Sequence, residues 1–327
     1  MDTPDLPSVT PPASEPHLPD VPVPGAESVF VHTRGIRLHV AVRGPRNAPL
    51  VLFIHGFGGG CFDWRELIPA LGDAPFRLAA VDMRGYGRSD KTPRGYDLTT
   101  AASDMCGTIR ALGHAEATVV GHGEGGLVGW TMAAHEPRRV SSLVTVASAH
   151  PLVLARTMLT RPFSQWSRLR DSLYAQLPRL PERTLTADDA KAVAVSFRRQ
   201  VAPGFRTTPL CRVHEDLRRT AMLVDKVAHL SCEYRRWTVR SHLRREGSVF
   251  DRTFPARTLA PVLCLDGSMD PAYDARIAEA GAARGGPGSR VKLLYGVGHF
   301  PHIEDAPTVA AVLREWLGVD APDTLAD

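Results

Sequence analysis

The sequence predicts an α/β fold, in which a mostly parallel eight-stranded sheet is flanked by helices and interrupted by an inserted helical cap. Three observations support this prediction. Continuous apolar runs alternate with helical patterns up to residue 150, the alternation stops in an arginine-rich helical stretch at residues 151–257, and it then resumes. A parallel sheet covered on both faces explains the alternation, and an insertion explains its interruption.

The predicted domain organisation has five parts. The first 25 residues hold eight prolines and almost no apolar periodicity, which is typical of a disordered tail. The core is expected in two pieces on either side of the cap, because the strand-and-helix pattern appears on both sides. The parts are a proline-rich tail at residues 1–27, the first part of the core at 28–150, the cap at 151–257, the second part of the core at 258–320 and a tail at 321–327.

The elements of the core follow one another in a simple order. SVFVHT and IRLHVAVRG alternate apolar and polar residues around Arg34 and Gly35, which predicts an antiparallel hairpin. Continuous apolar runs predict six buried strands after it, at residues 49–56, 77–85, 117–123, 141–148, 261–268 and 291–298. Helical patterns lie between and after these strands, in FDWRELIPALG, TTAASDMCGTIRALG, EGGLVGWTMAAHE and PTVAAVLREWLG.

Composition narrows the class of protein. The five cysteines are odd in number and never form a CxxC pair, so we predict neither a disulfide framework nor a zinc site, and we expect no metal and no cofactor. No apolar run is long enough to span a bilayer, and the beginning of the chain lacks the features of a signal peptide. We therefore expect a cytoplasmic protein. The sequence leaves the oligomeric state open, with a homodimer among the alternatives.

Charge is distributed unevenly along the chain. Residues 151–257 carry 21 Arg or Lys against 10 Asp or Glu, a net charge of +11, whereas the remainder carries −7. An anionic ligand or an acidic partner would explain this asymmetry. A GC-rich genome would explain it too, since only four of the 39 basic residues are lysine. No nucleic-acid-binding motif accompanies the charge, so we expect a small-molecule substrate or ligand and no nucleic acid.

Residues suited to chemistry follow three of the predicted strands, and ligand sites in open α/β sheets lie at the carboxyl ends of strands. HGFGGG is a glycine-rich loop in which the amide of Phe57 is placed to donate to a developing negative charge. GHGEGG has the form of a nucleophile elbow, G-x-Nuc-x-G, but its third position is Gly123. LDGSMDP and GVGHFPHIEDAP carry Asp270 and His299, an acid that would orient a base.

Five motifs in this order resemble the epoxide hydrolase and haloalkane dehalogenase branch of the α/β-hydrolases, especially the epoxide-hydrolase-like proteins of actinobacteria: HGFGG, DMRGYGRSDKTPRGYD, VVGHxxGG, LDGSMDP and GVGHFPHIEDAP. The resemblance spans about residues 28–318 and implies an α/β-hydrolase fold with a cap. It also implies that Tyr234, in EYRRW, is the acid that donates a hydrogen bond to an epoxide oxygen. We expect further side chains in the substrate pocket, namely His55, His122, Tyr174, Trp237 and Phe300.

Two departures from the family pattern concern the chemistry. The family carries aspartate or serine at the elbow, where this chain has Gly123, so the usual covalent first step is removed. Asp171 falls where the family has its other cap tyrosine, and Tyr174 follows three residues later. Because glycine adopts the positive φ of an elbow at little steric cost, a relaxed turn in a ligand-binding or partner-binding protein is a coherent interpretation.

Glu124 supports a second interpretation, because its carboxylate directly follows the vacant nucleophile position. The helix dipole also explains an acidic residue at this place. As a nucleophile, Glu124 would attack from a displaced backbone position with poor geometry. Alternatively, Glu124 or His299 activates a water while Tyr234 protonates the leaving oxygen. In either case the amide of Glu124 would be the second oxyanion donor, beside that of Phe57.

Three hypotheses about function remain. The first is a hydrolase of a small apolar epoxide or ester that acts without an elbow nucleophile, and the second is a catalytically inactive relative that binds a ligand or a partner. The third is non-hydrolytic chemistry, such as cyclisation or proton transfer, by His299 and Asp270 alone. The direction of the Glu124 carboxylate relative to His299 should separate the first two. We expect His302 to be a local hydrogen-bonding residue.

Overall fold

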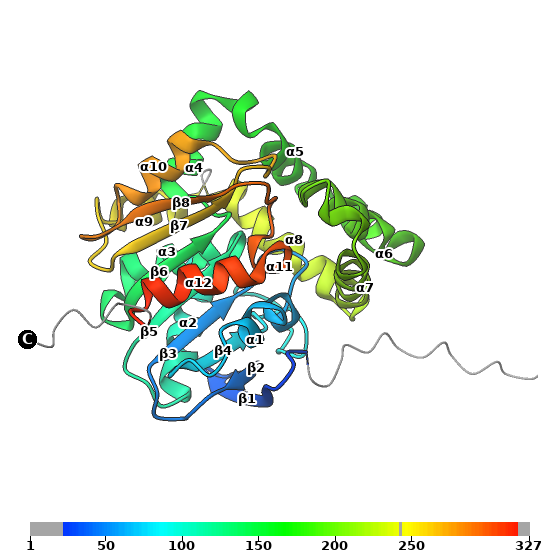
Figure 1. The fold of residues 1–327 in the computed structure, drawn as a ribbon. Helices are drawn as coiled ribbons and strands as arrows, with labels where there is room; N and C mark the ends of the chain where they lie inside the picture. Colours follow the sequence, from blue (N-terminus) through cyan, green and yellow to red (C-terminus); the bar gives the residue numbers. More distant parts are fainter. Residues whose placement is uncertain (1–21, 242–243, 320–327) are drawn as a thin grey trace, which may run out of the picture.

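The computed structural model describes residues 22–241 and 244–319 (Figure 1). Residues 1–21 of the predicted N-terminal tail and the predicted tail at 321–327 lie outside the described residues. The described part of the N-terminal segment already belongs to the fold, because Val23 is fully buried and Glu27 begins the first strand.

Eight strands form one sheet in the order β1-β2-β4-β3-β5-β6-β7-β8. The β1–β2 and β2–β4 pairs are antiparallel and the other five pairs are parallel, which confirms the predicted mostly parallel sheet. The predicted hairpin turns at Arg34 and Gly35, both with positive φ, as a two-residue hairpin loop requires. The strands are β1 (Glu27–Thr33), β2 (Ile36–Arg43), β3 (Leu50–Ile54), β4 (Arg77–Val81), β5 (Ala117–His122), β6 (Val140–Val146), β7 (Val262–Gly267) and β8 (Arg290–Leu294).

Helices cover both faces of the sheet, which explains why its central strands are apolar without interruption. Within β3, Leu52 packs in one hydrophobic cluster and its neighbour Phe53 packs in another, because successive side chains of a strand point to opposite faces. The first cluster includes α2 (Leu98–Ala111) and α3 (Glu124–His135), and the second includes α1 (Leu67–Ala70) and α12 (Ala306–Trp316). Further core helices are the 3₁₀ turns η1 (Cys61–Trp64) and η2 (Pro137–Arg139), and α10 (Ala275–Ala282) and α11 (Pro301–Glu304).

The described chain between β6 and β7 contains helices and no strand, as expected for an inserted helical cap. In Figure 1, α5 to α8 gather on one side of the sheet. Helix α6 is interrupted at residues 187–190, where three residues have positive φ. The helices are α4 (Pro151–Thr160), η3 (Pro162–Gln165), α5 (Trp166–Tyr174), α6 (Leu180–Gln200), η4 (Phe205–Thr207), α7 (Pro209–Leu223), α8 (Val227–Arg240) and α9 (Arg245–Thr253).

The segments in which the sequence predicts site residues lie at the carboxyl ends of the parallel strands. HGFGGG follows β3, the elbow follows β5, and Asp270 and His299 follow β7 and β8. Among the described residues, no helix is both long enough and apolar enough to cross a membrane.

Candidate functional site

His299 and Asp270 form a hydrogen-bonded pair after strands β8 and β7. His299 Nδ1 lies 2.7 Å from Asp270 Oδ2, and the side chains are 13% and 2% exposed. Burial raises the pKa of Asp270, but the charge and hydrogen bond of His299 outweigh burial, and the pKa is lowered from its usual value. The ionised carboxylate therefore holds the His299 proton on Nδ1 and leaves Nε2 as the basic nitrogen.

Glu304 holds the loop that carries His299, and sequence reasoning missed this residue. Its carboxylate accepts hydrogen bonds from the amides of Ala202, Gly298 and Phe300, at 2.8, 3.0 and 3.0 Å. Burial raises the pKa of the Glu304 carboxyl, and the three amides oppose this effect. A glutamate in the first turn of a helix, able to reach back to preceding amides, was the signal that the sequence offered.

Asp266 is a second buried carboxyl beside the pair. Burial, followed by the negative charge of Asp270, raises its pKa to about 7. The pKa values of these two carboxyls are thus shifted in opposite directions. Asp270 is ionised because its histidine stabilises the charge, whereas Asp266 retains a proton near neutral pH.

The elbow keeps its strained turn although the side chain is missing. Gly123 has φ 52° and ψ −114°, a conformation that residues with a side chain adopt only under strain. A Cβ added at Gly123 would approach only the Cα of Gly56, at 3.8 Å. The turn therefore retains both the geometry and the local space of a nucleophile position.

The Glu124 carboxylate is bound to the cap. Its Oε1 accepts a hydrogen bond at 3.0 Å from Nε of Arg235 in α8, and the guanidinium of Arg235 lies 3.5 Å from the ring centre of Phe57. Among the described residues, no hydrogen bond or ion pair joins Glu124 to His299. Arg235 thus connects the elbow to the glycine-rich loop through the cap, and no sequence pattern singled it out.

Tyr234, the predicted acid, is engaged by the protein in this conformation. Its hydroxyl donates to the main-chain carbonyl of Arg84 at 3.1 Å, and its ring stacks on Tyr86 at 5.9 Å between centres. Burial raises the pKa of Tyr234 well above its usual value. Donation of a proton to a substrate would require this hydroxyl to exchange partners, and the role of Tyr234 stays a prediction.

The three core residues expected in the pocket have different surroundings. Phe300 contacts the His299 ring edge-on at 5.1 Å, and His122 contacts the same ring at 5.0 Å. His55 is fully buried with both ring nitrogens used, because Nδ1 donates to the Gly56 carbonyl and Nε2 accepts from the Met83 amide. Phe300 and His122 are therefore assembled with the pair, whereas the His55 ring has a structural role.

The two cap residues expected in the pocket make their contacts within the cap. Tyr174 is 36% exposed, and its hydroxyl lies 2.6 Å from Thr184 Oγ1. The Trp237 ring packs edge-on against Phe250 at 5.6 Å. No hydrogen bond, ion pair or ring contact among the described residues joins Tyr174 or Trp237 to His299.

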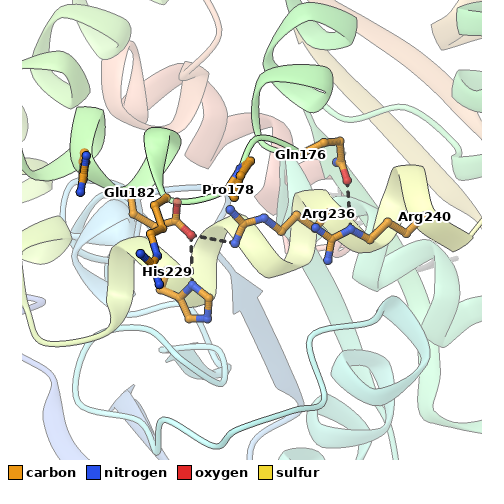
Figure 2. A pocket seen from close by; sticks show the side chains of 8 residues that line it. Gln176, Pro178, Glu182, His229, Arg236 and Arg240 are labelled. Carbon is orange, nitrogen blue, oxygen red and sulfur yellow. Dashed lines mark hydrogen bonds and ion pairs between the residues drawn. The ribbon is translucent and has the colours of Figure 1, made fainter.

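A cavity of about 640 Å³ opens in the cap rather than beside the pair (Figure 2). Its Glu182 carboxylate binds Arg236 at 2.7 Å and His229 at 3.0 Å, which lowers the pKa of Glu182 to about 2 against the effect of burial. The remaining lining is mostly basic: Gln176, Pro178, Arg179, Arg183 and Arg240. No predicted catalytic residue lines this cavity, so we place the chemistry at the strand ends.

Comparisons with known proteins agree with this fold. A family model described as alpha/beta hydrolase fold matches residues 49–306. The AB hydrolase superfamily protein YfhM of Bacillus subtilis is 36% identical over 181 residues, which cover 53% of this chain and 63% of that protein. Epoxide hydrolase 1 of Caenorhabditis elegans is 33% identical over 179 residues, which cover 53% of this chain and 43% of that protein. The chain thus spans about half of the length of these relatives.

A solved structure extends the similarity across the fold. Epoxide hydrolase A of Mycobacterium thermoresistibile has a TM-score of 0.70 and 26% sequence identity, and the match covers 90% of this chain and 98% of that one. The similarity therefore includes the cap as well as the sheet.

Proposed function

The chain belongs to the α/β-hydrolase fold family, and on this premise we propose that it hydrolyses a small apolar epoxide or ester through a water activated by His299. The observation that carries the proposal is the 2.7 Å contact between His299 Nδ1 and Asp270 Oδ2. Epoxide hydrolases among the relatives support the choice of an epoxide.

The reaction requires no covalent intermediate. Nε2 of His299 takes a proton from water while the water oxygen attacks a ring carbon of the epoxide, and the carbon–oxygen bond breaks. The ring oxygen then takes up a proton, and protonated His299 releases the proton that it took from the water, so that the net addition of water yields a vicinal diol and restores His299. With an ester, attack at the carbonyl carbon yields an acid and an alcohol. Gly123 favours this route, because space near Gly56 that a side chain would fill is left for the attacking water.

His299 is better placed than Glu124 to be the base. Arg235 engages Oε1 of Glu124, and Oε2 is buried without a partner among the described residues. His299 is 13% exposed, and no hydrogen bond occupies its Nε2 in the part of the chain that the structure describes. A free lone pair within hydrogen-bond reach of the substrate is the first requirement for a general base.

The test is turnover of an epoxide and ester panel in ¹⁸O-labelled water. We expect one labelled oxygen in each diol formed from an epoxide, and in each acid but not in the alcohol formed from an ester. Turnover should be lost in His299→Ala and retained in the control His114→Ala, which changes a histidine outside the site. Turnover that survives in His299→Ala would refute the assignment, and product without label would indicate non-hydrolytic chemistry instead.

A second candidate function is ligand binding without catalysis. Two contacts favour it. The Glu124 carboxylate binds Arg235, and the Tyr234 hydroxyl donates to the Arg84 carbonyl, so both of these predicted catalytic groups already have partners in the protein. This candidate predicts no turnover of the panel, together with ligand-induced thermal stabilisation that persists in His299→Ala. Catalysis that depends on His299 would exclude it.

A further inference from the structure

Three ligand atoms from distant parts of the sequence meet in the interior, next to the loop that carries His299. Asp63 lies in η1, His122 ends β5, and His302 lies in α11. One ligand atom from each of Asp63, His122 and His302 lies within 4.8 Å of the other two. The residues are 0%, 3% and 0% exposed, so the cluster is closed to bulk solvent.

Asp63 Oδ2, His122 Nδ1 and both ring nitrogens of His302 have no hydrogen-bond partner among the residues that the structure describes. The expectation that His302 makes local hydrogen bonds is therefore wrong, since both of its ring nitrogens lack a partner and its ring packs on Trp64 at 4.5 Å. Buried polar atoms without partners are costly and uncommon. Unpartnered atoms on three residues that converge in this way point to a shared ligand.

The hydrogen bonding of His122 indicates which kind of ligand fits. Its Nε2 donates to the main-chain carbonyl of His299 at 3.0 Å, so Nδ1 carries a lone pair. A histidine that ligates a metal commonly donates its other N–H to a carbonyl in this manner. Burial lowers the pKa of His122 and of His302 well below the usual range, which keeps both rings in the neutral, ligating form.

Two glycines of HGFGGG leave room around the ligand atoms. A Cβ at Gly59 would lie 2.1 Å from Asp63 Oδ2, and a Cβ at Gly56 would lie 2.9 Å from His122 Nδ1. Any other residue at either position would displace one of these two ligand atoms. The glycine-rich loop therefore borders the cluster as well as the elbow.

The positive charge of Arg218, a cap residue, disfavours a cation at this place. Its guanidinium donates to Asp63 Oδ1 at 2.7 Å, so the ion pair uses one carboxylate oxygen and Oδ2 stays available. Ligating carboxylates are commonly hydrogen-bonded through their outer oxygen. The pair also connects the cluster to helix α7 of the cap.

We propose that Asp63, His122 and His302 bind one Zn²⁺ ion, which braces the loop that carries His299 against η1 and β5. Two imidazoles and one carboxylate are a ligand set that zinc accepts, with a fourth position left for another donor. Tetrahedral zinc needs ligand atoms roughly 3.4 Å apart, so binding draws the three side chains inward. The case for this site does not rest on the proposed hydrolase activity, and cysteine and histidine spacing did not predict it.

The test uses the full chain purified without a histidine tag, stripped with a chelator and then titrated with Zn²⁺. We expect about one tightly bound Zn²⁺ per chain and a rise in Tm of several degrees. His302→Gln should lose both effects. The control His150→Gln, which changes an equally buried histidine elsewhere, should keep them.

Zinc-edge X-ray absorption of the wild-type protein decides the matter if His302→Gln does not fold. Two imidazole ligands and no sulfur are expected. A sulfur ligand would place the metal at the other buried group, His39, Cys61 and Asp82, and would overturn the proposal. Retention of well under one Zn²⁺ per chain, or equal binding by His302→Gln, would overturn it as well.

Discussion

The two sides of the candidate site differ in what their polar groups bind. On the histidine side, His299 is paired with Asp270 and its loop is held by Glu304, so a basic nitrogen remains available. On the elbow side, Glu124 is bound to Arg235 and the Tyr234 hydroxyl donates to a main-chain carbonyl. The strand ends position the first side, with main-chain contacts from Gln200 and Ala202 of the cap, whereas cap side chains determine the second. The Asp270–His299 pair is thus assembled beside an elbow whose central residue is Gly123.

The largest expected effect tests which side carries catalysis. Asp270→Asn should lower kcat by on the order of 10³–10⁴, because the amide no longer holds the histidine in the working tautomer. Glu124→Gln should lower kcat by less than about tenfold. Steady-state kinetics on a substrate found with the panel measure both, with the exposed Asp251→Asn as the control. An equal loss of kcat in the two variants would show that Glu124 is as important for catalysis as Asp270, and would contradict the proposed difference between the two sides.

Removal of Glu304 tests how the histidine side is held. Glu304→Ala leaves three amides without their acceptor, and we expect the free energy of unfolding to fall by roughly 2–4 kcal/mol. Glu315→Ala is the matched control, because Glu315 pairs with Arg290 at the surface and should change stability by less than about 0.5 kcal/mol. Denaturant unfolding distinguishes the two, and equal effects would contradict a structural role for Glu304.

Asp266 predicts an unusual pH dependence on the histidine side. Its folded pKa of about 7 lies above its usual value, so its favourable contribution is complete in acid and is lost as the pH rises from about 4 to 7. Asp266→Asn should therefore stabilise the protein at pH 8 by on the order of 4 kcal/mol and leave it nearly unchanged at pH 4. Asp270 has a lowered pKa and should show the opposite sign, with its contribution lost in acid. Unfolding at both pH values measures this, and an identical effect of Asp266→Asn at each would refute it.

The smallest expected effect concerns the elbow itself. Gly123→Ala places a Cβ on a residue with φ 52° but meets no close atom, so the cost should be strain alone, about 1 kcal/mol. Gly204→Ala is the control, because Gly204 has φ −64° and open space, and the change should be neutral or slightly stabilising. Thermal unfolding compares them. If Gly123→Ala lowers the stability no more than Gly204→Ala does, the turn is not strained.

Much of the histidine side could be predicted because its information is local. The strand runs, their order and the residues that follow them placed Asp270 and His299 at one edge of the sheet, and the structure has them 2.7 Å apart. The elbow was recognised from its glycines, and its positive φ at Gly123 agrees. Parallel strands with short loops leave little freedom for such residues.

The elbow side could not be predicted, because its contacts join segments far apart in sequence. Glu124 meets Arg235 across 111 positions, and Tyr234 meets the Arg84 carbonyl across 150. A pattern within one segment contains no information about which cap residue will face it.

The amino-acid sequence by itself determined the sheet, the inserted helices, the meeting of Asp270 with His299, and the glycine at the elbow, since each depends on residue type and spacing within a short segment. The tertiary structure alone decided where the Glu124 carboxylate points, which groups the cap engages, and that Asp63, His122 and His302 converge. The physical reason is that long-range side-chain contacts depend on how helices pack on the sheet, and packing is a property of the whole chain.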